Sequence, residues 1–307
     1  MTRTVMIRCD SSHTMGVGHL SRCSTLAKRM RERGLEPRFA CRPLAGDQRD
    51  QLRRQGFGVI DLDVNSAQAD AERLVVEASR VDACWFLLDH PELGMEYELK
   101  IRRSHEGRLA VNDGQYRQHD CDLLLNPNVY ASRENCESTV PEHCTILAGY
   151  RYFLLRDAFK TTEPAAGEGT LSVLLTLGGA DPENLTRDIC GQLTALDSQC
   201  RFDVVIGPAN RHAENLARTL SDMGDKRFRI HRQPDDFPGM LAHCTVCVSA
   251  GGITMGECAF LGKPVIALII AENQRRTVEH LAKRGAAIHS AAEDAGRWVD
   301  QLLRDPD

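Results

Sequence analysis

The chain alternates short apolar stretches with amphipathic helical segments, and this alternation occurs twice along its 307 residues. In the first half, the stretches that predict strands are residues 3–8, 37–41, 58–62, 84–89 and 109–112. In the second half, they are residues 171–177, 202–206, 228–231, 246–249 and 264–270. The helical segments include residues 69–79 and one that begins near residue 184. Strands that alternate with helices pair in parallel, so each half predicts a doubly wound α/β sheet with helices on both faces.

The composition changes to Thr, Pro, Ala, Gly and Glu around residues 160–169, which is typical of a linker. A chain of this length is long enough for two domains of ordinary size. We therefore predict an N-terminal α/β domain at residues 1–160, which contains a catalytic loop, and a C-terminal nucleotide-binding α/β domain at residues 170–307.

The composition, the net charge and the lengths of the apolar runs exclude several classes of protein. A hydrophobic fraction of 42% with 26% charged residues is typical of a globular protein. No apolar run reaches the roughly 18 residues of a membrane span, so no membrane insertion is expected. The N-terminus lacks a signal-peptide pattern, so a cytoplasmic location is expected, and the 12 cysteines should be reduced thiols. The net charge of −5 gives no reason to expect nucleic acid as a partner.

The first candidate site is the turn Gly16-Val-Gly18-His19, which joins the first predicted strand to a helix. His19 falls at or just before the first helical turn, where free backbone N–H groups and the helix dipole disfavour an imidazolium. A neutral imidazole can accept a proton there, and the two glycines let a ligand approach the backbone. Two interpretations remain open: a general base, or a histidine that only caps or packs against the helix start.

The second candidate site, residues 249–257, follows a predicted strand and opens a helix. Gly251 and Gly252 leave backbone N–H groups at the helix N-terminus free for a phosphate, and Glu257 could reach a ribose hydroxyl pair one turn later. A second glycine pair, Gly178-Gly179, ends another strand of this half. Together these features favour a nucleotide site over a tight turn with a solvated glutamate.

Two further polar segments follow apolar strands. Asn273 and Gln274 come after the strand at 264–270, where neutral amides can hydrogen-bond a sugar or phosphate; in isolation, an ordinary helix start explains them better. Asp89 and His90 close the strand at 84–89, at the sheet edge where His19 is expected. Either could orient a substrate, and the carboxylate could instead be a helix cap.

No pattern in the sequence predicts a metal site. Cys244 and Cys247 have the spacing of a metal or redox pair, but no second pair matches them and they enter an apolar strand. The histidines other than His19 and His90 are scattered without metal-ligand spacing. Among them, His119 is unusual because it lies in the polar run Arg117-Gln-His-Asp-Cys-Asp.

Several of these motifs occur together in one family. Asp10-Ser-Ser, followed by the turn to His19-Leu-Ser-Arg-Cys, resembles the opening of the UDP-2,4-diacetamido-2,4,6-trideoxy-β-L-altropyranose hydrolases of pseudaminic acid biosynthesis. The similarity continues, in order, through residues 112–128, 149–156, 176–186, 250–257 and 272–275. Because it extends over nearly the whole chain, this resemblance is more specific than any single motif.

The resemblance implies a GT-B-like fold, in which two doubly wound parallel-sheet domains face a central cleft. It also implies that the C-terminal half binds the nucleotide, that His19 is the base that activates water, and that Glu257 binds the ribose. The predicted substrate-binding residues are Asp10, Gly16, Gly18, Asp89, Asn273 and Gln274. The predicted nucleotide-binding residues are Gly178, Gly179, Ile206, Gly251, Gly252, Ile253 and Glu257.

The resulting prediction is an inverting hydrolase that releases UDP from a UDP-linked 2,4-diacetamido-2,4,6-trideoxy hexose. It would need no cofactor and no metal, and would act as a monomer or weak oligomer. The alternatives are a GT-B glycosyltransferase that uses a UDP-sugar donor, and a domain that binds a UDP-sugar without turnover. Pro91 follows Asp89-His90 where the family usually has a tyrosine, which leaves the choice of hexose open.

Overall fold

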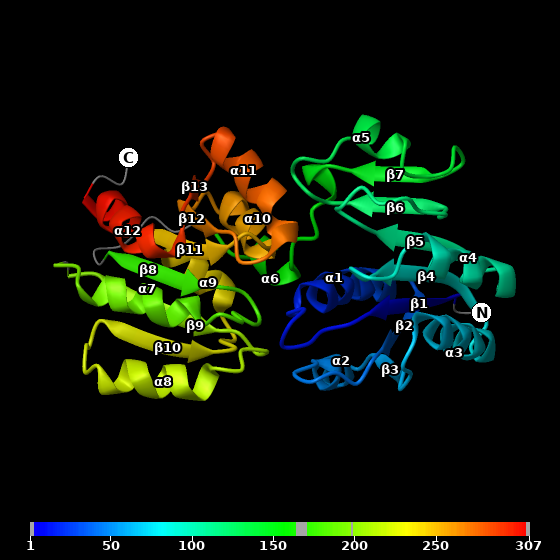
Figure 1. Cartoon of the computed structure of the whole chain (residues 1–307), viewed down its shortest axis with the longest axis horizontal. Coiled ribbons are helices and arrows are strands. Elements are labelled where there is room, and N and C mark those ends of the chain that lie inside the picture. The colour runs from blue at the N-terminus through cyan, green and yellow to red at the C-terminus, as the bar shows by residue number, and fades with distance from the viewer. Residues whose placement is uncertain (1–2, 164–170, 198, 305–307) are drawn as a thin grey trace. The chain divides into compact units, whose positions relative to one another are not determined.

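The computed structural model describes residues 3–163, 171–197 and 199–304. Its strands form two parallel sheets, and helices flank each of them (Figure 1). The contacts within the chain define two units. The first consists of Met1–Ser11 and His19–Leu154, and the second of Ser12–Gly18 and Leu155–Asp307. The prediction of two doubly wound α/β sheets is confirmed.

The first sheet has the strand order β3-β2-β1-β4-β5-β6-β7, with parallel pairing throughout. Its strands are β1 Arg3–Cys9, β2 Leu35–Cys41, β3 Gly58–Asp61, β4 Ala83–Asp89, β5 Arg108–Asn112, β6 Leu123–Asn126 and β7 Thr145–Ala148. β6 and β7, each four residues long, were not predicted from the sequence.

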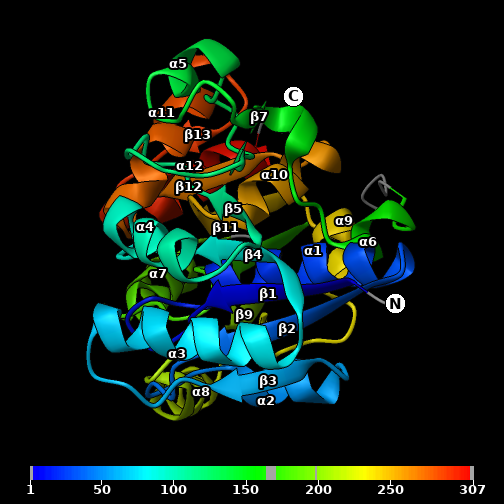
Figure 2. The same cartoon turned by 90° about the vertical axis from the view of Figure 1, so that its right-hand side faces the viewer.

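Side chains along β1 alternate between two cores, one on each face of the first sheet. Val5, Ile7 and Cys9 pack with buried residues of α1 (Gly18–Glu32) and α2 (Arg49–Arg54). Met6 packs on the opposite face with α3 (Ala67–Arg80) and α4 (Met95–Ser104). Figure 2 looks onto this unit. A short helix, α5 (Arg133–Glu137), follows β6.

Arg8 extends from β1 toward α3 and is completely buried. Its guanidinium donates to both carboxylate oxygens of Asp70, from Nε at 2.9 Å and from Nη2 at 2.7 Å. The Tyr97 hydroxyl donates to the same carboxylate at 2.5 Å. A buried charge requires such partners, so this ion pair fixes α3 against the sheet.

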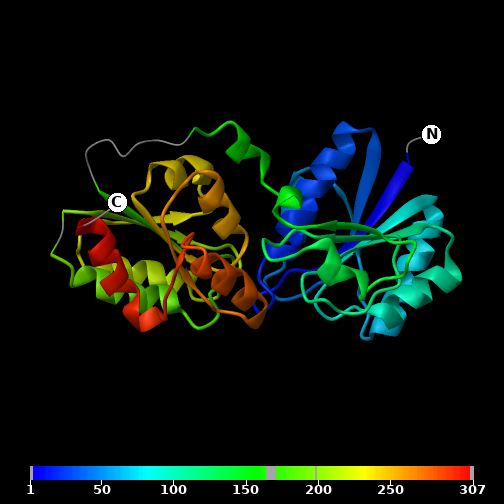
Figure 3. The ribbon, with the colours of Figure 1, turned by 90° about the horizontal axis from the view of Figure 1, so that it is seen from above.

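The second sheet has the strand order β10-β9-β8-β11-β12-β13 and is also parallel. Its strands are β8 Ser172–Thr176, β9 Arg201–Ile206, β10 Phe228–Arg232, β11 Val246–Ala250, β12 Val265–Leu268 and β13 Ile288–His289. One face packs against α7 (Leu185–Thr194), α8 (Ala213–Asp222) and α12 (Ala295–Arg304). In Figure 3, α9 (Phe237–His243) and α10 (Ile253–Phe260) lie on the other side of the sheet. Helix α11 (Arg275–Lys283) precedes β13.

The contacts place the division between the units at Leu154, before the predicted end of the first domain at residue 160. The helix α6 (Asp157–Lys160) belongs to the second unit, where the ring of Phe159 packs edge-on against Phe237. Most of the predicted linker, 164–169, lies outside the described residues. None of the described helices is long and apolar enough to span a membrane.

Candidate active site

Three neighbouring strands of the first sheet bring polar side chains to its carboxyl edge. β4 pairs in parallel with β1 on one side and β5 on the other. Asp10 directly after β1, Asp89 at the end of β4 and Asn112 at the end of β5 therefore share this edge, and all three are buried. Ligands of doubly wound proteins bind beyond this edge of the sheet.

His19 lies in the first turn of α1 and contacts Asp89. Its Nδ1 is 2.6 Å from Oδ1 of Asp89, and its side chain is 11% exposed. When Nδ1 carries the proton and donates it to the carboxylate, Nε2 keeps a free lone pair. A nucleophile-activating histidine is oriented by a third group in the same way. The structure thus brings together two of the predicted site residues.

The Asp89 carboxylate is buried and bonded on both oxygens. Arg22 donates to Oδ1 from Nη2 and to Oδ2 from Nε, each at 2.6 Å, and Asn112 donates to Oδ2 at 2.9 Å. Burial acts to raise the pKa of Asp89, but the charge of Arg22 and the hydrogen bonds from His19 and Arg22 outweigh it, so the pKa lies well below its ordinary value. This geometry supports orientation of His19 by an ionised Asp89. Direct contact between Asp89 and a substrate stays a prediction.

Asp10 occupies a second buried network at the same edge. Its oxygens accept from Arg8 Nη1 at 2.6 Å, from the backbone N–H and Nε of Arg42, both at 2.8 Å, and from His90 Nε2 at 3.2 Å. Burial acts to raise the pKa of Asp10, and the bonds from His90 and Arg8 lower it well below its ordinary value. Because its oxygens already have these protein partners, the geometry supports a structural role. Contact with a substrate stays a prediction here too.

His90 is a neutral histidine within that network. Its Nδ1 accepts from the backbone N–H of Glu92 at 3.1 Å, which assigns the ring proton to Nε2, the atom that faces Asp10. Burial lowers the pKa of His90 further. Both ring nitrogens have a partner, so His90 is a packed histidine at the strand end.

Gly16 and Gly18 shape the turn before α1 in different ways. Gly16 has a φ of 75°, a conformation that favours glycine, and its N–H donates to the carbonyl oxygen of Ser12 at 2.9 Å. At Gly18 an added Cβ would meet nothing within 4 Å. Gly16 is therefore needed for the turn, and Gly18 leaves open space beside the helix start.

In the second unit, the loops after β8 and β9 pack together at backbone distance. A Cβ on Gly207 would lie 2.1 Å from the carbonyl oxygen of Gly178 and 2.5 Å from that of Gly179. Gly178 has a φ of 75°, and Ile206, at the end of β9, is buried in the core. The predicted residues Gly178, Gly179 and Ile206 are thus neighbours. Gly207 was not predicted, although its position directly after a strand is the signal that could have revealed it.

The N-termini of α7 and α10 differ in their caps. The Asp181 carboxylate accepts from the N–H groups of Leu185 and Thr186, at 2.9 and 3.0 Å, at the start of α7. At α10, Gly252 is the N-cap and makes no side-chain cap hydrogen bond. An uncapped helix start with its backbone N–H groups directed outward is the arrangement that binds anions.

Gly251 and Gly252 meet different surroundings. A Cβ on Gly251 would lie 2.4 Å from Val278 Cγ2 and 3.0 Å from Gln274 Cβ, so glycine is required for packing against α11. Gly252 is exposed, and a Cβ there would meet nothing within 4 Å. Space is thus available for a ligand beside Gly252 and Ile253, the first residue of α10.

Gln274 and Asn273 lie in a 3-10 helix, Glu272–Gln274, between β12 and α11. The Oε1 atom of Gln274 accepts from the backbone N–H of Ile270 at 3.1 Å. The structure therefore places Gln274 beside Gly251, while Asn273 is exposed to solvent.

Glu257 in α10 is completely buried, and both of its oxygens accept from Arg156, at 2.6 and 2.8 Å. From the sequence, Glu257 is expected to reach a ribose, and its pairing with Arg156 was not predicted. The signal for Arg156 was its place at the end of the matched segment 149–156. A ribose contact by Glu257 stays a prediction.

His119 lies between two buried carboxylates. Its Nδ1 is 2.6 Å from Glu98 Oε1 and its Nε2 is 3.3 Å from Asp113 Oδ2. Burial acts to lower the pKa of His119, but the bonds to Asp113 and Glu98 raise it to about 9. The resulting imidazolium joins α4 to the loop after β5, which is a structural role.

No group of metal-ligating side chains occurs among the described residues. The twelve cysteines are free, and Cys244 and Cys247 are buried. Burial raises the pKa of Cys244 to about 12, so its thiol is protonated at neutral pH.

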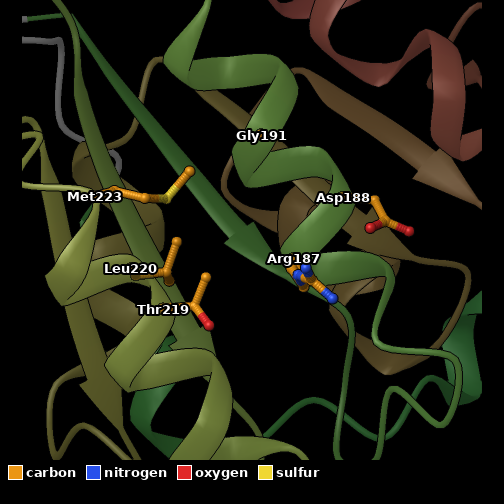
Figure 4. A pocket seen from close by; sticks show the side chains of 6 residues that line it. All are labelled: Arg187, Asp188, Gly191, Thr219, Leu220 and Met223. Atoms are coloured by element: carbon orange, nitrogen blue, oxygen red, sulfur yellow. The ribbon is translucent and has the colours of Figure 1, made fainter.

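A surface groove of about 470 Å³ lies between α7 and α8 (Figure 4). Its lining comes from Arg187, Asp188, Gly191, Thr219, Leu220 and Met223. None of the predicted site residues lines it, so this groove does not contribute to the candidate site.

Known proteins resemble the chain over most of its length. The UDP-2,4-diacetamido-2,4,6-trideoxy-beta-L-altropyranose hydrolase of Campylobacter jejuni is 24% identical over 281 residues, which cover 92% of this chain and 97% of that protein. The spore coat polysaccharide biosynthesis protein SpsG of Bacillus subtilis is 23% identical over 295 residues, which cover 92% of this chain and 82% of that protein. No family model matches the chain.

Solved structures agree on the fold. The structure of S. aureus MnaA with UDP aligns with a TM-score of 0.65 at 13% identity, and the alignment covers 99% of this chain and 88% of that one. Identity this low supports the fold alone. Together with the two parallel sheets and the matched motifs, these comparisons confirm that the chain has a GT-B-like fold and resembles the UDP-2,4-diacetamido-2,4,6-trideoxy-β-L-altropyranose hydrolase family.

Proposed function

We propose that this protein is an inverting hydrolase that releases UDP from a UDP-linked 2,4-diacetamido-2,4,6-trideoxy hexose, a step toward pseudaminic acid or a related nonulosonic acid. The similarity to the C. jejuni hydrolase, over 97% of that protein, supports the substrate class. The observation on which the reaction type depends is the 2.6 Å contact between His19 Nδ1 and Asp89 Oδ1, which leaves Nε2 as the candidate base.

In this proposal, the second unit binds the nucleotide. The uncapped start of α10 at Gly252 and Ile253 supplies backbone N–H groups for the diphosphate, and developing negative charge there is stabilised as the bond to the sugar breaks. Gly178, Gly179, Ile206 and Gly251 shape the neighbouring loops. Glu257, oriented by Arg156, is the proposed ribose-binding carboxylate.

The chemistry is a direct displacement at the anomeric carbon. A water molecule attacks that carbon while its proton passes to Nε2 of His19. The bond between the carbon and the β-phosphate oxygen breaks, and its electron pair leaves with UDP. Because the diphosphate is a good leaving group, no strong general acid is needed. The resulting imidazolium is stabilised by Asp89 and returns its proton to solvent. Base catalysis of this kind is typically worth about 10²–10⁴-fold in rate.

The test is a proton-NMR time course of the purified protein with candidate UDP-diacetamido sugars and no acceptor. The proposal expects free sugar and UDP, with the anomer first released inverted relative to the substrate. Retention of configuration would reject direct attack by water. Turnover only after an acceptor is added would favour a glycosyltransferase, and binding of intact UDP-sugar without turnover would favour a binding domain.

A further inference from the structure

Arg22 lies one turn after His19 on α1 and shares its contacts. Its Nη2 is 2.6 Å from Asp89 Oδ1 and 2.8 Å from His19 Nδ1. The three groups therefore form a closed triangle. The Arg22 side chain is 27% exposed, whereas the Asp89 side chain is fully buried.

This triangle constrains the tautomer of His19. A guanidinium has only donors, and a carboxylate has only acceptors. Arg22 uses Nη2 and Nε on the two oxygens of Asp89, and the carboxylate requires donors on both sides. Two arrangements fit the contacts: Nδ1–H of His19 donates to Oδ1 of Asp89 beside the Arg22 donor, or Nδ1 accepts from Arg22 Nη2 at 2.8 Å. The first pairs the buried carboxylate with one more donor. The opposite tautomer would leave Nδ1 as an acceptor 2.6 Å from a carboxylate oxygen, where two lone pairs repel.

We propose that Arg22 is a positioning residue that holds Asp89 ionised and bidentate, and thereby keeps the His19 proton on Nδ1 and its Nε2 lone pair available. The tautomer is argued from the 2.6 Å contact of Nδ1 with the Asp89 carboxylate, against the 2.8 Å contact with Arg22. Its value for catalysis rests on the proposed function, in which Nε2 is the base.

The other groups that face Asp89 are neutral. Asn112 donates to Oδ2 from β5, and the Cys23 thiol lies 3.5 Å from the same oxygen. Burial raises the pKa of Cys23 to about 11. The hydrogen bond with Cys23, together with burial, raises the pKa of Cys9, on β1, well above its ordinary value, so both thiols stay protonated near neutral pH. Neither can replace the charge of Arg22.

Two substitutions of Arg22, one that removes its positive charge and one that keeps the charge but not the planar guanidinium, should have different effects. Arg22→Gln leaves Asp89 facing His19 without a competing cation, so protonation of His19 is favoured. The acid limb of the rate profile should then move to higher pH by about one unit, with a roughly tenfold lower rate at pH values on that limb. Arg22→Lys keeps a charge without the planar fork. The pH of its acid limb should therefore lie close to the wild-type value, while its maximal rate stays below that of the wild type.

The tautomer can be read directly from long-range ¹⁵N–¹H NMR spectra of the full-length ¹⁵N-labelled protein at pH 8, with the His19 signals assigned by their loss in His19→Gln. The wild type and the control Arg29→Gln, on the same helix, should both show a proton on Nδ1 alone. Arg22→Gln should show a larger share of the charged ring, with protons on both nitrogens. A wild-type proton on Nε2, or an Arg22→Gln spectrum identical to the wild type, would overturn the proposal.

The rate profile is the second measurement, and it separates two kinds of failure. If the wild type releases no UDP from any candidate substrate, the proposed function is wrong, and the NMR tautomer still decides the role of Arg22. If the wild type is active and the acid limb is the same in Arg22→Gln, the positioning role is wrong. Arg22→Lys guards against misfolding, because it keeps the buried carboxylate paired.

Discussion

One guanidinium, that of Arg156, donates to both oxygens of the buried Glu257 carboxylate, from Nε at 2.6 Å and from Nη2 at 2.8 Å. The two residues are 101 positions apart and connect the segment before α6 with α10. The guanidinium also lies 5.0 Å from the ring centroid of Phe159 and 5.1 Å from that of Phe237. These contacts fix the orientation of the carboxylate that is proposed to bind the ribose.

Arg156→Met should destabilise the protein by about 1–3 kcal/mol, because it leaves the Glu257 charge buried without a partner. Adding Glu257→Gln to that variant should recover part of the loss. The measurement is urea unfolding of the two variants beside Lys160→Met, which removes an exposed ion pair with Asp157 and should change little. Equal unfolding midpoints for Arg156→Met and the wild type would show that the pair does not stabilise α10.

Asp89→Asn should lower kcat about 10²–10³-fold while KM changes little. The amide keeps the size of the side chain but cannot stabilise the imidazolium that forms as water is deprotonated. Steady-state kinetics with the UDP-sugar give both constants. Asp50→Asn, an exposed change on α2, serves as the control. A wild-type kcat in Asp89→Asn would remove Asp89 from the mechanism.

Gly252→Ala should weaken UDP binding about tenfold and leave stability nearly unchanged, because its Cβ would enter the open space at the start of α10. Gly251→Ala should instead destabilise the fold, since its Cβ would lie 2.4 Å from Val278. Calorimetric titration with UDP and urea unfolding separate the two effects. Gly191→Ala, inside α7 with open space around it, should gain up to about 1 kcal/mol and bind UDP normally. Unchanged UDP affinity in Gly252→Ala would contradict the phosphate site.

His119 should make the stability of the protein depend on pH. Its pKa in the folded protein is about 9, above the ordinary value near 6.5, so its stabilising contribution is complete below pH 6.5 and is lost as pH rises toward 9. The difference in unfolding free energy between the wild type and His119→Gln should therefore shrink between pH 6 and pH 9.5, on the order of 2–3 kcal/mol. Urea unfolding at both pH values measures it, and a constant difference would contradict the ion cluster with Glu98 and Asp113.

Much of the fold could be predicted because its strands are buried apolar runs between amphipathic helices. The predicted helix at 69–79 corresponds to α3, which begins two residues earlier because the Ser66 side chain caps it. The strands β6, β7 and β13 were missed, and β13 has only two residues, too few to show a period. Sheet order was beyond prediction, since the pairing of β4 with β1 depends on contacts far apart in sequence.

The candidate site was predictable where it follows from the sheet edge. Parallel strands bring Asp89 to the edge where His19 was expected, and the structure places the two in contact. The partners of the buried charges were not predictable, because Arg8 with Asp70 and Arg156 with Glu257 pair across 62 and 101 residues. No local pattern distinguishes such a buried carboxylate from a solvated one.

The most direct test of the account is kcat of His19→Asn at saturating UDP-sugar, with UDP affinity measured on the same sample. If Nε2 of His19 is the base, kcat should fall about 10²–10⁴-fold while UDP affinity stays at the wild-type value. A variant that turns over as fast as the wild type would contradict the central role of His19.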